Sequence, residues 1–303
     1  LRSRMSKESL QRENCGTTAR ILPERGFNCY SLVVDGFDYM HQAPDLFHDG
    51  SATRSGSPIL FPWPNRIGGA RFSWHGREYH LPVTEPATGS SLHGYACHSR
   101  WKVLSTGPDH ATAEFVLEPD GEHPWPGQGG LRVTYRVEPR ALVVETDVFA
   151  GTEDLPFGLG FHPYLRVPGP FDEWLLQCDA AQSWTLAQMI PTGDVVGVDE
   201  RLDFRIGRTL GEEHLDDVLT GLPAATELTA RGSLRCASAT LTVSSDPAFR
   251  DYVLFTPTSR DAVAIEPYTC PTDAVHLEER GIDAGWRVLP AGRSQRFTWR
   301  IDV

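Results

Sequence analysis

Apolar and polar residues alternate along several short segments of the chain. In residues 131–138 every odd position is apolar and every even position is polar, and residues 297–303 repeat this pattern. Because successive side chains of a strand point to opposite faces, this period predicts strands with one buried and one solvent-facing side. Richness in Val, Leu, Thr and aromatic residues predicts three more strands, at 141–149, 238–243 and 252–255.

The spacing of these segments predicts an all-β fold. Segments 70–74 and 77–81 flank His75-Gly76, which suits a two-residue hairpin turn. Helical spacing is scarce, and we expect one or two helical turns only at 6–12 and 210–219. Strands separated by turns, without helices between them, favour an antiparallel β-sandwich over βαβ units. Strand patterns continue on both sides of a Gly- and Pro-rich loop expected at 119–130, so we expect residues 1–303 to form a single domain.

Composition and charge narrow the function classes. The 303 residues include 28 Gly and 23 Pro, which leave little room for long helices. The net charge of −12 argues against nucleic acid as a partner, and no apolar run is long enough to cross a membrane. The segment 1–5 lacks the apolar region of a signal peptide, and its simplest interpretation is a natural start at Met5 after added residues. With six Cys and no CxxC pair, we expect reduced thiols, no metal site and a cytoplasmic location.

Two histidines lie beside residues that shape loops. His93 precedes Gly94, which permits close approach of the backbone, and the alternative is an ordinary surface loop. His162 precedes Pro163, which favours an extended conformation at a strand end, where catalytic groups often lie. Imidazole titrates near neutrality and suits general acid or base catalysis. A hydrogen-bonded histidine in a structural turn is the competing interpretation.

A carboxylate and an aromatic loop complete the candidate chemistry. Glu266 follows four apolar residues, so it is either the exposed end of a strand or a buried group with a shifted pKa. Trp63 and Arg66 lie in a Pro-bounded loop, and both suit sugar faces and hydroxyls as well as ordinary packing. No P-loop, dinucleotide fingerprint or HExxH motif is present; the G-x-G of 158–160 is followed by an aromatic residue, a His and a Pro.

Taken in order, these motifs resemble the aldose 1-epimerase (galactose mutarotase-like) family. The resemblance spans most of the chain, and its motifs are Asn65-Arg66-Ile67, Leu92-His93-Gly94, His162-Pro163-Tyr164, Leu215-Asp216-Asp217 and Glu266-Pro267. It implies a large twisted antiparallel β-sandwich, the galactose mutarotase-like supersandwich, with an open concave cleft. It also implies a free monosaccharide as the partner and no cofactor.

The resemblance also implies roles for individual residues. Glu266 is expected to act as the general base on the anomeric hydroxyl, and His162 as the general acid on the ring oxygen. The groups that it implies for holding the sugar are Arg66, His93 and Asp216. Beside them we expect Asn65, Trp63 and Tyr164 to bind the sugar, because neutral hydroxyls suit polar partners and an aromatic wall. Asp217 is an alternative to Asp216, because Leu219 replaces the family's aromatic residue.

Three alternatives stay open at this stage. Leu92-His93-Gly94-Tyr95-Ala96 resembles the hexose-6-phosphate epimerase branch of the family or uncharacterised epimerase-like proteins, although Cys97 stands where that branch tends to have Arg. A phosphorylated sugar would need a basic cluster, for which the candidates are Arg54, Arg71, Arg77 and Arg100. A non-catalytic sugar-binding protein is a second alternative. Glycoside cleavage by Asp216 and Glu266 is a third. The sugar, the pathway and the oligomeric state are left open.

Overall fold

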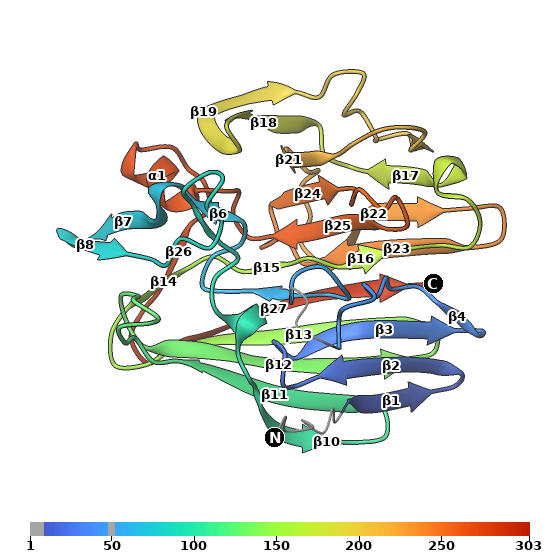
Figure 1. Ribbon diagram of the computed structural model, residues 1–303, viewed down its shortest axis with the longest axis horizontal. Helices are drawn as coiled ribbons and strands as arrows, with labels where there is room; N and C mark the ends of the chain where they lie inside the picture. The colour runs from blue at the N-terminus through green and yellow to red at the C-terminus, as the bar shows by residue number, and fades with distance from the viewer. Residues whose placement is uncertain (1–8, 48–51) are drawn as a thin grey trace.

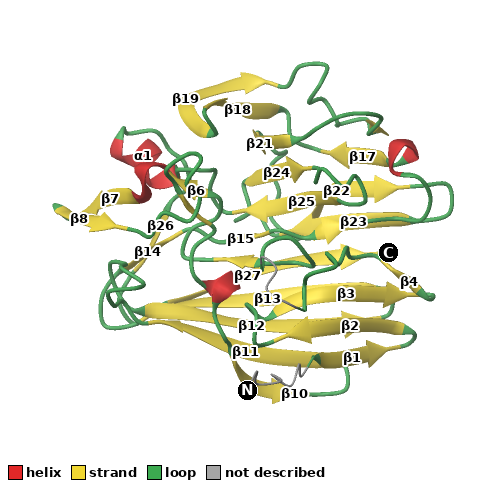
Figure 2. Cartoon of the chain, in the orientation of Figure 1, coloured by secondary structure: helices red, strands yellow, loops and turns green. Residues whose placement is uncertain are grey.

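The computed structural model describes residues 9–47 and 52–303, which form antiparallel sheets almost throughout (Figures 1 and 2). The expected start at Met5 lies outside the described residues. The largest sheet has nine strands in the order β10 (Lys102–Thr106), β11 (His110–Leu117), β12 (Gly129–Glu138), β13 (Ala141–Ala150), β27 (Ser294–Asp302), β23 (Thr240–Ser245), β22 (Thr229–Arg235), β17 (Leu175–Cys178) and β20 (Arg208–Thr209).

An eight-stranded sheet forms the second layer. Its order is β19 (Ile190–Gly197), β18 (Gln182–Ala187), β21 (Asp216–Thr220), β24 (Asp251–Phe255), β25 (Val263–Tyr268), β15 (Gly160–Phe161) and β5 (Ile59–Leu60), and β16 (Tyr164–Leu165) also pairs with β25. The two layers share one apolar core, because Phe161 lies against Trp299 with ring centroids 5.1 Å apart. The inward faces of both sheets are therefore buried together, as in a sandwich.

Smaller sheets complete the molecule. Their strands are β1 (Leu10–Asn14), β2 (Thr17–Leu22), β3 (Asn28–Val34) and β4 (Phe37–Asp38), then the pairs β6 (Arg66–Ile67) with β9 (Ser91–Leu92), β7 (Arg71–Trp74) with β8 (Arg77–His80), and β14 (Leu155–Phe157) with β26 (Arg287–Leu289). The only α-helix of the described residues is α1 (Ala274–Glu279), and single 3-10 turns lie at Gly68–Ala70, Ala96–His98 and Phe171–Glu173. No helix in the described part of the chain is long and apolar enough to span a membrane.

The structure confirms the predicted fold class and most of the predicted strands. The alternating segments 131–138 and 297–303 are the core strands β12 and β27, and the shorter segments are β13, β23 and β24. The predicted hairpin is formed by β7 and β8, and its turn lies at His75 and Gly76. Their φ angles of 48° and 77° give the left-handed conformation that such a turn needs. The Gly- and Pro-rich segment is a loop up to Gln128, after which Gly129 begins β12.

Both helical predictions are wrong within the described residues. Residues 10–12 belong to strand β1, which pairs along its whole length with β2. The segment 210–219 contains a turn followed by β21, and the positive φ of Gly211 separates Leu210 from the strand. The helix-like spacing of its leucines thus comes from a turn joined to a strand.

Candidate active site

His162 and Glu266 face each other across two neighbouring chain segments. Strand β15 pairs Gly160 with Tyr268, and β16 pairs Tyr164 with Ala264, so the register sets His162 opposite Glu266. Nε2 of His162 lies 3.3 Å from Oε1 of Glu266. The His-Pro sequence therefore does what its extended preference predicts, since it keeps the segment in line with β25.

Burial controls the protonation of this pair. Glu266 is 1% exposed and His162 is 6% exposed. Burial raises the pKa of Glu266 well above its ordinary value and lowers the pKa of His162 to about 3. Both shifts favour the neutral forms, a protonated carboxyl and a neutral imidazole. The two groups together hold one proton, and its transfer from Glu266 to His162 produces the ion pair.

Asp216 lies on the same face of the sheet as Glu266. The pairing of β21, β24 and β25 aligns Val218 with Val253, and Val253 with Glu266. Side chains in register share a face, and so do residues two apart, which places Asp216 on the Glu266 side. Asp217 lies on the other side, where its carboxylate pairs with Arg201. The negative charge of Asp216 raises the pKa of Glu266, and the positive charge of Arg66 lowers it.

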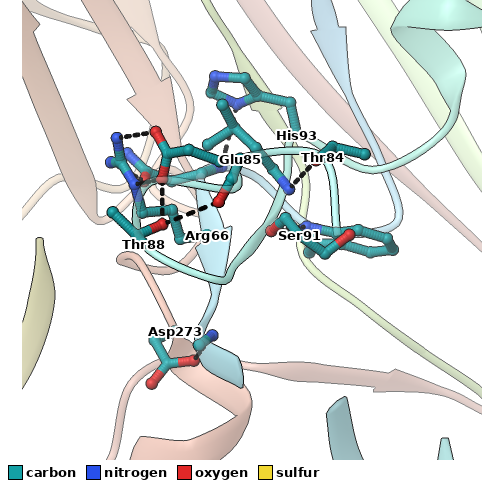
Figure 3. A network of polar contacts seen from close by, with 11 residues as sticks. Arg66, Thr84, Glu85, Thr88, Ser91, His93 and Asp273 are labelled. Carbon is teal, nitrogen blue, oxygen red and sulfur yellow. Dashed lines mark hydrogen bonds and ion pairs between the residues drawn. The ribbon is translucent and has the colours of Figure 1, made fainter. Parts of the chain in front are cut away.

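The guanidinium of Arg66 is held by a carboxylate from the following loop (Figure 3). Its Nε donates to Oε2 of Glu85 at 2.6 Å and its Nη2 to Oε1 at 2.7 Å, which is a bidentate pair. Nη1 donates to Oδ1 of Asn65 at 3.0 Å. Thr88 in turn donates a short hydrogen bond to Glu85. Arg66, whose charge acts on Glu266, is thereby fixed in orientation and paired with a carboxylate.

His93 joins the site through the Asn65 loop. The amide of Asn65 donates to Nδ1 of His93 at 3.3 Å, and the amide of His93 donates to the Asn65 carbonyl at 2.8 Å. Burial lowers the pKa of His93 well below its ordinary value, so the ring is neutral with its proton on Nε2. The rings of His93 and His162 lie edge to face, 5.6 Å apart. His93 therefore presents a neutral N–H donor beside the His162–Glu266 pair.

The two aromatic residues expected to contact a sugar have different surroundings. Trp63 is 1% exposed, stacks on Trp125 at 5.0 Å and donates its indole N–H to the Ser91 carbonyl. Tyr95 lies edge to face with the same indole, so Trp63 is packed in the core, and its contact with a sugar stays a prediction. Tyr164 stacks on His162 at 4.4 Å, and its hydroxyl donates to the Thr53 carbonyl. Tyr164 supports the histidine ring.

Sequence reasoning missed three groups of this site. They are Tyr268, whose hydroxyl donates to Glu266 at 2.6 Å, and the supports of Arg66, Glu85 and Thr88. The period of a strand could have identified Tyr268, since it lies two residues beyond Glu266. Glu85 lies 19 residues from Arg66 in a loop without regular pattern, and no signal in the sequence pairs them.

Three of the four arginines proposed to bind a phosphate have side-chain partners of their own. Arg54 pairs with Asp45, and Arg100 pairs with Glu24. Arg77 lies over the ring of Tyr79. Among the residues that the structure describes, no three His, Cys, Asp or Glu side chains are grouped closely enough to hold a metal ion. All six cysteines are free thiols.

Comparison with known proteins identifies relatives across nearly the whole chain. The sequence model of one family, described as aldose 1-epimerase, matches residues 13–301. The uncharacterised Escherichia coli K12 protein YihR is 25% identical over 245 residues, which are 80% of this chain and 77% of that protein.

Two further relatives carry mutarotase names. Galactose mutarotase of Rattus norvegicus is 31% identical over 167 residues, and the match spans 50% of this chain and 46% of the rat protein. The solved structure of a galactose mutarotase-like protein from Clostridium acetobutylicum has a TM-score of 0.84 at 20% identity, covering 97% of this chain and 94% of that one. The structural likeness extends over both sheets of the sandwich.

Proposed function

The chain belongs to the aldose 1-epimerase family, and from this premise we propose that it interconverts the α and β anomers of a free hexose. The observation that carries the proposal is the distance of 3.3 Å between His162 and Glu266. Mutarotation takes a proton from the anomeric hydroxyl and gives one to the ring oxygen, and both oxygens are bonded to the same carbon. A carboxylate beside an imidazole fits two such neighbouring oxygens.

The proposed reaction begins after the proton of Glu266 has passed to His162, so that the pair is a carboxylate and an imidazolium. Glu266 takes the proton of the anomeric hydroxyl, while His162 gives its proton to the ring oxygen. The bond between the anomeric carbon and the ring oxygen breaks, which leaves an aldehyde and a free hydroxyl. Rotation of the aldehyde and the reverse proton transfers close the ring as the other anomer. The pair ends each cycle with the proton count that it had at the start.

The surrounding polar groups suit the binding of a neutral sugar. His93 offers an N–H donor, Asp216 offers acceptors for hydroxyls, and Arg66 retains N–H donors beyond those bound to Glu85 and Asn65. The bidentate pair with Glu85 balances the charge of Arg66. Because this arginine is already neutralised, the site favours a neutral hexose over a phosphorylated one.

The competing functions find less support. Glycoside cleavage needs two carboxyl groups on either side of the scissile bond, whereas the Glu266 carboxyl contacts the imidazole of His162 and the phenol of Tyr268. A protein that only binds sugars has no use for a titratable acid and base buried side by side, because taking such groups out of water costs free energy.

Polarimetry tests the proposal. Freshly dissolved α-glucose and α-galactose are followed with the wild-type protein and with Glu266→Gln and His162→Asn. We expect wild-type acceleration of at least one sugar and a loss of about 10²- to 10⁴-fold in each variant. Equal rates for wild type and Glu266→Gln would refute the acid–base assignment. Release of reducing ends from disaccharides would favour glycoside cleavage instead.

A further inference from the structure

The two oxygens of the Glu266 carboxyl group have different partners. Oε1 lies 3.3 Å from His162, and Oε2 accepts a hydrogen bond of 2.6 Å from the hydroxyl of Tyr268. Glu266 and Tyr268 are two residues apart on β25 and therefore share a face of the sheet. The carboxyl plane is thus fixed by contacts at both of its oxygens.

Packing holds the Tyr268 ring in place. The side chain is fully buried in a smaller apolar cluster, separate from the core that the two sheets share. Trp184, Val253 and Leu277 belong to the same cluster. In the register of β15 and β25, Gly160 lies opposite Tyr268, and a Cβ at Gly160 would come within 2.6 Å of the ring. The second glycine of the G-x-G segment 158–160, which has no phosphate role, leaves the space that this ring fills.

The phenol acts as a donor and keeps its proton. Burial and the neighbouring charge of Glu266 raise the pKa of Tyr268 well above its ordinary value. Its hydrogen bond to Glu266 lowers the pKa of that carboxyl and so opposes the larger effect of burial. A buried carboxylate with a donor on one oxygen is easier to ionise than one without.

We propose that Tyr268 is a positioning residue that holds Oε2 of Glu266, so that Oε1 faces His162 and the anomeric hydroxyl as a carboxylate. This inference rests on the proposed mutarotase function. In this arrangement a single oxygen performs the proton transfer, and the other is kept from rotating into its place. Tyr268 itself touches no sugar atom and exchanges no proton with one.

The test compares Tyr268→Phe with wild type across a pH series of α-galactose and α-glucose mutarotation. The substitution conserves the ring and removes one donor. We expect the acid limb of the rate profile to move up by about one to two pH units. We also expect kcat to fall about 10- to 100-fold at the pH of half-maximal wild-type activity, with KM little changed.

Tyr252→Phe is the matched control. Tyr252 is equally buried, on the adjacent strand β24, and its hydroxyl donates to Ser245 at 2.8 Å on the opposite face. The Tyr252→Phe variant should lose about as much free energy of unfolding as Tyr268→Phe, but its pH–rate profile should not shift. The inference would be overturned if the pH–rate profile of Tyr268→Phe were unchanged. It would also be overturned if Tyr268→Phe lost the same activity as Tyr252→Phe at every pH.

A second readout separates this inference from the proposed function. The Glu266 carboxyl of ¹³C-labelled protein is titrated by NMR and assigned with Glu266→Gln. A higher midpoint in Tyr268→Phe than in wild type supports the positioning role even if no sugar is converted. Equal midpoints overturn it, whereas a wild-type protein that accelerates no aldose would refute the function alone.

Discussion

At the scale of single residues, the face of a strand decides which of two neighbouring carboxylates reaches the site. Asp216 and Asp217 are adjacent in the sequence, yet the pairing of β21 with β24 directs them to opposite sides of the sheet. Asp216 lies near enough to Arg66 and Glu266 for its charge to influence their pKa values. Asp217 instead forms an ion pair with Arg201.

Neutralising these two carboxylates one at a time tests the assignment. Asp216→Asn should lower kcat/KM for the sugar by about 10- to 100-fold, because it removes charged acceptors for sugar hydroxyls. Asp217→Asn, the matched control, should keep a rate near wild type, since a partly exposed ion pair contributes little. Polarimetric rates for both variants are the measurement. A greater loss in Asp217→Asn would reverse the assignment.

Asp251 predicts a pH dependence of stability that is separate from catalysis. Its carboxyl is fully buried, and burial raises its pKa from 3.8 to about 6 despite the hydrogen bond from Trp184. Between these values the folded state binds more protons than the unfolded state, so this group makes stability fall as pH rises from about 4 to 6. Asp251→Asn should therefore raise the free energy of unfolding at pH 7 by up to about 3 kcal/mol, and change it little at pH 4.

Urea unfolding of wild type and Asp251→Asn at several pH values measures this effect. The difference between the two proteins should grow from pH 4 to pH 7 and then level off. A difference that is constant with pH would mean that packing at this position, and not ionisation, accounts for the change.

Several residues of the site could be predicted from the sequence, and others could not. The sequence predicts the local conformation at both His162 and Glu266: His162 precedes a proline, which favours extended backbone, and Glu266 follows the apolar residues of a strand. The burial of Trp63 could not be predicted, because a Pro-bounded loop suits either the surface or the core, and the rings that pack on it, Tyr95 and Trp125, come from other parts of the chain. The support of Arg66 by Glu85 depends on how the loop between β8 and β9 folds, which no local pattern encodes.

At the scale of elements, two loops hold each other in place beside the acid–base pair. The short pair of β6 with β9 joins the Asn65 loop to the His93 loop, and the amide of Tyr95 donates to the Phe61 carbonyl. Gly94 has a φ of 66°, and a Cβ there would lie 2.2 Å from the Phe61 carbonyl oxygen. This glycine lets the His93 loop pass against the backbone of its neighbour.

Gly94→Ala should accordingly be costly. We expect a loss of about 2 to 4 kcal/mol in the free energy of unfolding, from left-handed strain together with a backbone clash. Gly36→Ala is the control, because its φ of 83° is equally left-handed but a Cβ would meet nothing within 4 Å. Chemical unfolding of both variants separates the clash from the strain. Equal losses would show that the close approach contributes nothing.

Element prediction succeeded where a period extends over a long strand and failed where segments are short. Residues 131–138 of β12 alternate without a break, whereas α1 has only six residues, too few for a helical period to be recognised. Residues 10–12 form a strand because β2 pairs with them, and tertiary pairing overrides weak local propensity.

At the scale of the whole molecule, the acid–base pair depends on the packing of two sheets. Phe161, the residue before His162, lies against Trp299 of the nine-stranded sheet. A Cβ at Gly232 of β22 would come within 2.9 Å of Ile265, the residue before Glu266. Phe161 and Ile265, which precede His162 and Glu266, are therefore both packed against the nine-stranded sheet.

This shared core predicts that the chain unfolds as a single domain. Loss of either sheet would expose the apolar face of the other, so neither is expected to persist alone. Far-ultraviolet circular dichroism, tryptophan fluorescence and the proposed mutarotase activity should lose their native values in one coincident transition in urea. Val133→Ala, in the nine-stranded sheet and far along the chain from the site, should move all three transitions to lower urea together. Two separated transitions, with activity following only one of them, would show instead that the layers unfold independently.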